Sequence, residues 1–226
     1  MKLKRLSGII MAGVIAFSTS IVSVNADTGN SLQDVVSVKL IESNDDYKKY
    51  EIINKENGDI EYLTEKESGN MYIATDSENN NYYMEKEDNV IEVKDENNKV
   101  IDTIDLMDRS NNNIKVNKPS TKATAWKYVG TSKSSINSDV GKVSLLIGVI
   151  SSVAGLKPAE SVVVTIASYA ISNKIKNLWY IKKTYKRTYD VGGVAGIGKE
   201  MKLVTSFYKV SNYTGLIKTT TSITKY

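Results

Sequence analysis

The sequence predicts an α+β protein in which a small antiparallel β module is followed by a helical hairpin packed on a second antiparallel sheet. Three observations support this prediction. Short segments rich in Ile, Val, Tyr and Thr alternate with turn residues between residues 50 and 106. Two uncharged segments, 143–156 and 161–173, have the length of short helices. A strand-like segment rich in Tyr, Trp, Lys and Arg then spans residues 177–190.

Residues 1–26 have the pattern of a secretory signal peptide. Lys2, Lys4 and Arg5 precede an apolar segment at 8–17, and small and polar residues lead to Ala26. The apolar segment is shorter than the roughly 20 residues that a membrane-spanning helix needs. We expect cleavage after Ala26 and a secreted, extracellular protein. Association with the cell surface would be non-covalent, because the chain has no Cys that could be acylated.

Residues 27–110 are predicted to form an acidic, β-rich module. Between residues 27 and 118 the chain has 22 acidic and 11 basic side chains. The Asn57-Gly58 pair is a typical hairpin turn, since both residues tolerate positive φ. No acidic stretch has the spacing of a 12-residue calcium loop, so we expect no metal and no cofactor. The expected strands are 50–54, 60–64, 71–75, 81–85, 90–94 and 99–106, preceded by an apolar segment at 32–40.

Residues 111–125 are predicted to be a linker to a basic module at 126–226. The segment is rich in Asn, Ser and Thr, lacks apolar periodicity and contains Pro119. From residue 119 onwards the charge reverses to 16 basic and 4 acidic side chains. An acidic region of this kind can act as a pro-region or as an intramolecular mask for the basic module. Proteolysis near residue 118 would then separate the two.

The basic module begins with a short strand at 126–129, followed by the two helices in a tight antiparallel hairpin. Gly141, Gly148 and Gly155 recur every seven residues, and this spacing predicts close helix packing. Fourteen helical residues span about 21 Å, less than the hydrocarbon core of about 30 Å. Two interpretations of the helices therefore stay open: a buried layer of the fold, or a hairpin that inserts into a membrane after release from the fold.

The segment 177–190 is predicted to be a basic strand that pairs with strands at 202–210 and 215–226. One face is predicted to hold Trp179, Ile181, Tyr185 and Tyr189, interrupted by Lys183 and Arg187, and the other mostly Tyr180, Lys182 and Lys186. Tyr and Trp beside Lys and Arg favour contact with a membrane or a polyanion. The alternative is an ordinary amphipathic sheet with a basic outer surface. The residues predicted to make the membrane or polyanion contact are Trp179, Tyr180, Lys182, Lys183, Tyr185, Lys186 and Arg187.

Catalysis is not expected. The chain contains no His and no Cys, which removes the usual general base, thiolate nucleophiles and disulfides. The segment from Gly193 to Lys199 matches the spacing of a phosphate-binding loop, but Glu200 stands where Ser or Thr would hold magnesium. We interpret it as a glycine-rich turn. No recognition helix or RNA-binding motif is present, so nucleic acid is not an expected partner.

The order of signal peptide, acidic module, linker and basic module resembles the unmodified bacteriocin precursors of Bacillus relatives, the geobacillin-like kind. The resemblance implies antibacterial activity, a cationic C-terminal region that meets anionic envelopes, and a separate self-protection protein. The first functional hypothesis is thus a secreted cationic antibacterial or membrane-active protein with an acidic pro-region. The alternative is a secreted cell-wall-associated binding or structural protein without killing activity. In both, the partner is anionic membrane lipid or wall polymer.

Overall fold

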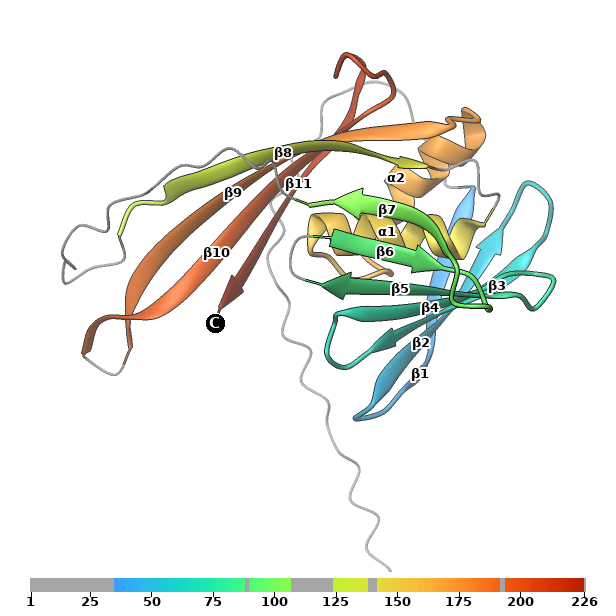
Figure 1. The fold of residues 1–226 in the computed structure, drawn as a ribbon, viewed down its shortest axis with the longest axis horizontal. Coiled ribbons are helices and arrows are strands. Elements are labelled where there is room, and N and C mark those ends of the chain that lie inside the picture. The colour runs from blue at the N-terminus through green and yellow to red at the C-terminus, as the bar shows by residue number, and fades with distance from the viewer. Residues whose placement is uncertain (1–34, 88–89, 107–123, 138–141, 192–193, 226) are drawn as a thin grey trace, which may run out of the picture.

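The computed structural model describes residues 35–87, 90–106, 124–137, 142–191 and 194–225. The expected signal peptide, Gly141 and most of the expected linker lie outside the described residues. The described residues form two antiparallel sheets and two short helices, so the predicted α+β class is confirmed (Figure 1).

The first sheet is a seven-stranded meander in which each strand pairs with the next one along the chain. All six predicted strands are present, and two of them, at 71–75 and 90–94, have the predicted bounds. Side chains alternate between the two faces of each central strand, and one face is buried. Tyr72 and Ala74, for example, are buried side chains of one such strand. The strands are β1 (Val36–Ser43), β2 (Tyr47–Asn54), β3 (Ile60–Lys66), β4 (Met71–Thr75), β5 (Asn81–Glu87), β6 (Val90–Lys94) and β7 (Val100–Asp105).

The second sheet contains four strands in the order β11-β10-β9-β8. The predicted pairing of the basic strand with two later strands is confirmed. The strand predicted at 126–129 is longer than expected, because its alternation continues to residue 137. The strands are β8 (Lys127–Asn137), β9 (Asn177–Val191), β10 (Val194–Tyr208) and β11 (Leu216–Lys225).

Most of the glycine-rich segment belongs to strand β10 and is not the turn that we expected. Gly198 lies opposite Tyr189, and the aromatic ring of Tyr189 covers it. A Cβ atom at position 198 would lie 2.5 Å from this ring. The glycine therefore provides space for a cross-strand aromatic side chain, a use of glycine known from sheets.

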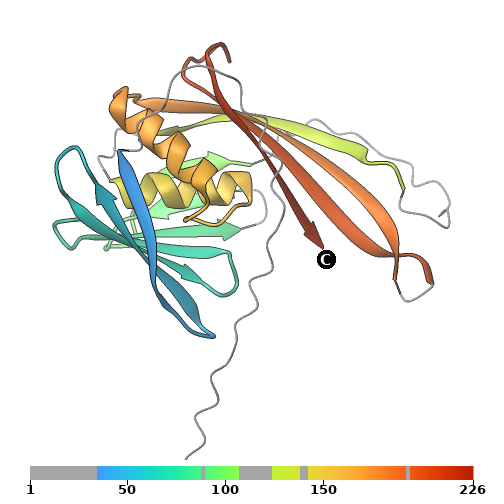
Figure 2. The same ribbon diagram turned by 180° about the vertical axis from the view of Figure 1, so that it is seen from behind.

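The helices are α1 (Val143–Ala154) and α2 (Ser161–Ser172), close to the predicted ranges. All twelve residues of α1 are buried, because α1 lies between the sheets and contacts β2 to β5 on one side and β8, β10 and β11 on the other. Helix α2 packs on the edge strands β1 and β11. It crosses α1 obliquely (Figures 1 and 2), so the tight antiparallel hairpin is not confirmed.

The described glycines of α1 serve purposes other than helix–helix packing. A Cβ atom at Gly148 would lie 2.5 Å from Met84 Cε and 3.2 Å from Leu63 Cδ1, so the close approach is to the first sheet. Gly155 follows the last helical residue with φ of +66°, a left-handed conformation that glycine adopts without steric cost. Close packing at Gly148 is thus present, but its partner is the first sheet and not the second helix.

The acidic and basic halves share one hydrophobic core. Ile52, Leu63 and Met84 come from the first sheet, Ile147 from α1 and Phe207 from the second sheet, and all are buried in the same cluster. The expected boundary falls in the undescribed segment 107–123, but no boundary divides the core. The acidic half therefore packs against the inner face of the basic half and is not a separately folded module.

The start of α1 is bound by a buried carboxylate of the first sheet. Glu61, 3% exposed, accepts hydrogen bonds from the backbone N–H groups of Val143 at 3.1 Å and Ser144 at 2.8 Å. It also accepts one from Ser144 Oγ at 2.5 Å. These donors have no partner within the helix, and a negative charge here complements the helix dipole. Glu61 thus performs the N-capping function from another element.

A second carboxylate holds the residue before α1. Asp76, in the turn after β4, forms an ion pair with Lys142. It also accepts hydrogen bonds from the Asn80 side chain at 3.0 Å and the Asn80 and Glu78 backbone at 2.9 Å. Burial alone would raise the pKa of Asp76, but the bonds from Lys142, Asn80 and Glu78 outweigh it and lower the pKa to about 2.

We predict that Glu61→Ala lowers the free energy of unfolding by about 2–3 kcal/mol, because three donors lose a charged acceptor. Urea denaturation should be followed both by far-ultraviolet circular dichroism and by Trp fluorescence. Both Trp residues belong to the C-terminal half, so fluorescence reports on the second sheet. The two transitions should shift together. Exposed Glu56→Ala is the control, and an unchanged fluorescence transition in Glu61→Ala would contradict a shared core.

We predict that the contribution of Asp76 to stability is lost as pH falls from about 4 to 2. The pKa is about 2 in the folded chain and 3.8 without these contacts, so the stabilisation is complete above pH 4 and amounts to about 2 kcal/mol. Asp76→Asn should therefore destabilise the protein at pH 6 and much less at pH 2, as measured by urea denaturation at each pH. As the control, Glu96→Gln at an exposed position should leave the free energy of unfolding close to that of wild type at both pH values. If Asp76→Asn lowers the free energy of unfolding equally at pH 6 and pH 2, the lowered pKa of Asp76 is refuted.

Candidate functional site

The two faces of the second sheet have different environments. On strand β9, Leu178, Tyr180 and Lys182 point inwards and are buried. Trp179, Ile181 and the odd-numbered residues up to Tyr189 point the other way, because side chains alternate across a strand. The register extends this division to the neighbouring strands. The outer face is turned away from the first sheet (Figures 1 and 2).

Strand alternation divides the seven predicted contact residues between the two faces. Trp179, Lys183, Tyr185 and Arg187 lie on the outer face. Lys186 is exposed on the opposite face, beyond the region where the helices cover the sheet. Tyr180 is completely buried and donates a hydrogen bond to the Asp105 carbonyl oxygen at 2.9 Å, and Lys182 is also buried. Surface contact by Tyr180 and Lys182 is thus excluded in this fold, because both fill the space between the sheets.

One group of aromatic and cationic side chains lies on the outer face towards the β9–β10 turn. The Arg187 guanidinium lies 4.3 Å from the centroid of the Trp126 ring. Lys202 Nζ lies 4.7 Å from the Trp126 ring and 4.7 Å from the Tyr185 ring. Tyr128 packs edge-on against Tyr185 at 5.7 Å. Cation–π contacts of this kind hold the long Lys and Arg side chains against the sheet.

A buried carboxylate anchors this distal group. Glu200 is buried and accepts a hydrogen bond from Arg187 Nε at 2.6 Å. Lys225 Nζ lies 4.0 Å from the same carboxylate and 5.3 Å from the Tyr189 ring. Arg187 is therefore partly neutralised, whereas the contacts described for the Lys202 ammonium group are with aromatic rings.

A second, proximal group lies on the same face near the start of β9. Trp179 packs edge-on against Tyr213, with ring centroids 6.1 Å apart. Tyr208 also packs edge-on against Tyr213, with ring centroids 5.9 Å apart. Lys133 Nζ lies 5.3 Å from the Tyr213 ring centroid. Tyr213 adopts positive φ in the β10–β11 turn, which returns its ring to the sheet. The outer face therefore has a cation held by aromatic rings near each end.

The sheet as a whole is strongly basic. Its four strands contain ten Lys or Arg side chains and only two carboxylates, Asp190 and Glu200. Asp190 accepts a hydrogen bond from the Gly196 backbone N–H at 2.9 Å, and Glu200 binds Arg187. Strands β9 and β10 also extend well past the helices (Figure 1). This surface can attract anions, but the groups described on it include no pair arranged for acid–base chemistry.

Sequence reasoning missed several members of these groups: Trp126, Tyr128, Lys133, Tyr189, Lys202, Tyr208, Tyr213 and Lys225. The alternation within each strand was visible in the sequence. The register between strands was not, because it depends on the bulges and turns that align β8, β10 and β11 with β9. Lys202, for example, meets Tyr185 only because the two residues are cross-strand partners.

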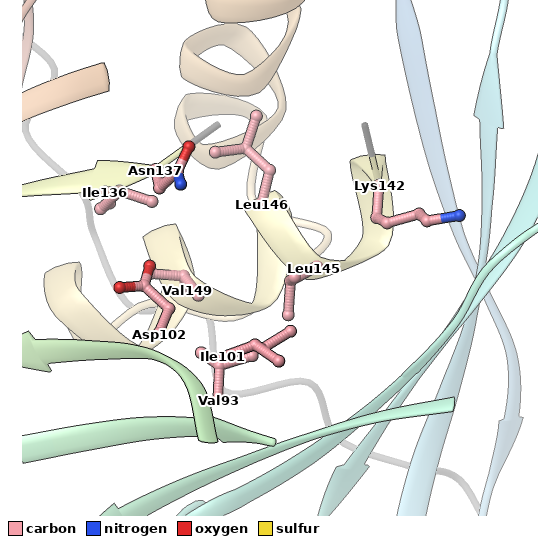
Figure 3. Close-up of a pocket in the computed structure, with 9 residues that line it drawn as sticks. All are labelled: Val93, Ile101, Asp102, Ile136, Asn137, Lys142, Leu145, Leu146 and Val149. Atoms are coloured by element: carbon pink, nitrogen blue, oxygen red, sulfur yellow. The ribbon is translucent and has the colours of Figure 1, made fainter. Parts of the chain in front are cut away.

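A small cavity of about 160 Å³ lies where the first sheet, α1 and the end of β8 meet (Figure 3). Leu145, Leu146 and Val149 of α1 face it together with other aliphatic side chains. Asp102 and Asn137 are at its border, while the Lys142 side chain points away from it. The cavity is mainly apolar and lacks convergent polar groups, so we assign it no binding function.

Two further searches concern the described residues alone. No group of three or more acidic side chains in the described ranges lies close enough together to hold a metal ion. No helix in the described part of the chain is both long and apolar enough to cross a membrane.

The comparisons with known proteins add no relationship. No protein-family model, no curated protein and no solved structure matches this chain. The functional argument therefore depends on the geometry of the site.

Proposed function

We propose that the protein is secreted and binds the anionic polymer of a bacterial cell wall through the outer face of the second sheet. The observation that carries the proposal is the pair of cation–aromatic groups on one basic, uncovered sheet face. Lys and Arg are the side chains that bind phosphate, as ion pairs and hydrogen-bond donors. Because aromatic rings already hold these cations in place, less side-chain entropy is lost on binding.

The separation of the two groups favours a long ligand. Lys133 pairs with Ile181, six residues from Arg187 along β9. At about 3.3 Å per residue, the two groups lie roughly 20 Å apart. Lys183 lies exposed between them on the same face. An extended polymer with repeated phosphate charges can contact all three positions at once, whereas a small anion can contact only one.

The acidic half has a structural role in this proposal. Among the described residues, its contacts with the second sheet run mainly through α1 on the inner face. The described part of the acidic half therefore does not occupy the basic outer face. This arrangement favours a wall-binding protein that acts as one body over one that is activated by cleavage.

We predict that Lys133→Gln/Lys183→Gln/Lys202→Gln weakens binding to poly(glycerol phosphate) by about 100-fold. Each cation near an anionic surface contributes about 1 kcal/mol, and the triple change removes three. Affinity should be measured by calorimetry in low salt and again at higher salt, where screening reduces it. Wild-type affinity should also fall steeply when glycerol phosphate monomer replaces the polymer.

A matched control is present on the opposite face of the same sheet. Lys127, Lys186 and Lys199 are exposed there, and their replacement by Gln changes the net charge equally. This control variant should retain most of the wild-type affinity. If both variants lose affinity equally, net charge alone drives binding. The proposal that the outer face is the binding surface would then be rejected.

A second candidate function, membrane-active antibacterial protein, is favoured by the end of the β9–β10 hairpin. Val191, Val194 and Ile197 are 42%, 54% and 56% exposed there. Aliphatic side chains flanked by Lys and Arg suit the boundary between anionic headgroups and acyl chains. Insertion of the helices would require both sheets to separate from α1, so we assign membrane contact to the hairpin end.

For this candidate we expect the full chain to release dye from vesicles that contain phosphatidylglycerol and much less from neutral vesicles. Val194→Asn/Ile197→Asn should lower the release several-fold, because two aliphatic groups no longer enter the bilayer. Leu216→Asn/Ile223→Asn is the control, since both residues are similarly exposed but lie on β11. Absence of release from either type of vesicle would remove this candidate and leave wall binding unaffected.

A further inference from the structure

A row of polar side chains crosses the inner face of the second sheet. Ser132 of β8 pairs with Lys182 of β9, and Lys182 pairs with Thr205 of β10. The three residues are 3%, 7% and 0% exposed. The adjacent inward pair, Tyr180 and Phe207, is part of the hydrophobic core. Burial of the Lys182 charge in this position costs free energy unless a ligand or a partner compensates the charge.

The row is not satisfied by the described protein groups. The hydroxyl oxygens of Ser132 and Thr205 have no hydrogen-bond partner among the described residues. Within the described residues, no carboxylate forms an ion pair with Lys182, although the charge of Asp105 acts on it and raises its pKa. Buried polar groups are nearly always paired, so two unpaired hydroxyls beside one buried ammonium need an explanation.

A second lysine lies on the inward face of the first sheet, because Lys86 shares its face of strand β5 with the buried Met84. Lys86 of β5 is half-buried, and burial lowers the pKa of its ammonium. Burial, followed by the charge of Lys86, lowers the pKa of Lys182 to about 8, against the opposing effect of Asp105. Each sheet thus contributes one partly desolvated ammonium group to the interior. Such a pair is stabilised when an anion lies between the cations.

A cleft leads from the surface to Lys86. Its volume is about 690 Å³, and Lys86, Ser151 and Ser222 are among the residues that line it. Ser151 is buried on α1 and is the third unpaired hydroxyl of the described residues. The acidic residues of the cleft already accept hydrogen bonds: Glu65 from Tyr50 Oη at 2.9 Å and Glu160 from the Lys157 backbone at 3.0 Å. The unpaired groups are hydroxyls, each of which can donate a hydrogen bond to an anion.

We propose that Lys182, Lys86 and the hydroxyls of Ser132 and Thr205 form an internal binding site for a phosphate group, reached through this cleft. A phosphate has several acceptor oxygens pointing in different directions, which matches donors that come from three strands and two sheets. The site lies on the face opposite to the proposed wall-binding surface and does not depend on that proposal. The phosphate could be free or carried by a glycerol phosphate unit, and the two sources share the same contacts.

The test is a titration of the full chain with inorganic phosphate at pH 7 and constant ionic strength, followed by thermal denaturation and by ³¹P NMR. Wild type should show a saturable rise in Tm and a saturable ³¹P shift, because a ligand that binds only the folded state stabilises it. Lys182→Met should lose the saturable part of both signals. Without phosphate, Lys182→Met should be more stable than wild type, since a buried charge is removed.

The matched control is Lys183→Met, because Lys183 is the next residue but is exposed on the outer face. Lys183→Met should keep the saturable rise in Tm and the saturable ³¹P shift. Lys86→Met should weaken phosphate binding at least tenfold. This second variant tests the site even if Lys182→Met fails to fold. A parallel titration with glycerol phosphate identifies the source, since tighter binding of either compound assigns the ligand to that class. Equal, non-saturable stabilisation of all variants would be a general salt effect and would overturn the site.

Discussion

The structure depends on the burial of one helix on all sides. Helix α1 has no charged residue and no polar face, so neither sheet alone could cover it. It lies between the two sheets, and each sheet covers one side of it. Glu61 and Asp76 of the first sheet bind the start of the helix and the residue before it. The acidic and basic halves are consequently parts of one core.

This constraint decides which cations can meet a partner. Strand β9 contains four Lys or Arg residues between residues 182 and 187, but the helix layer buries one face of its first half. Lys182 is enclosed there, whereas its neighbour Lys183 is exposed. Beyond the helices both faces of the sheet are exposed, and Lys186 is therefore accessible. One strand can thus contribute to an outer surface for polymers and to an interior site for a small anion.

The outer face also illustrates how a sheet can hold long cationic side chains in place without carboxylates. Lys133, Lys202 and Lys225 each lie over an aromatic ring supplied by another strand or turn. Among the described residues of this face, Glu200 provides the carboxylate; it is buried beneath Arg187 and lies 4.0 Å from Lys225 Nζ. Cation–π contacts leave N–H donors directed to solvent, whereas ion pairs would occupy them. A surface built in this way keeps its positive potential.

The sequence by itself determined the α+β class, the predicted strands and both helices, because periodicity and turn residues are local signals. It also determined the alternation that separates Tyr180 and Lys182 from Trp179 and Lys183. Only the tertiary structure decided which side of β9 is covered, that Gly148 meets Met84 instead of α2, and that Lys202 meets Tyr185. These contacts depend on strand register and on the position of α1 between two sheets, and both result from packing of residues far apart in the chain.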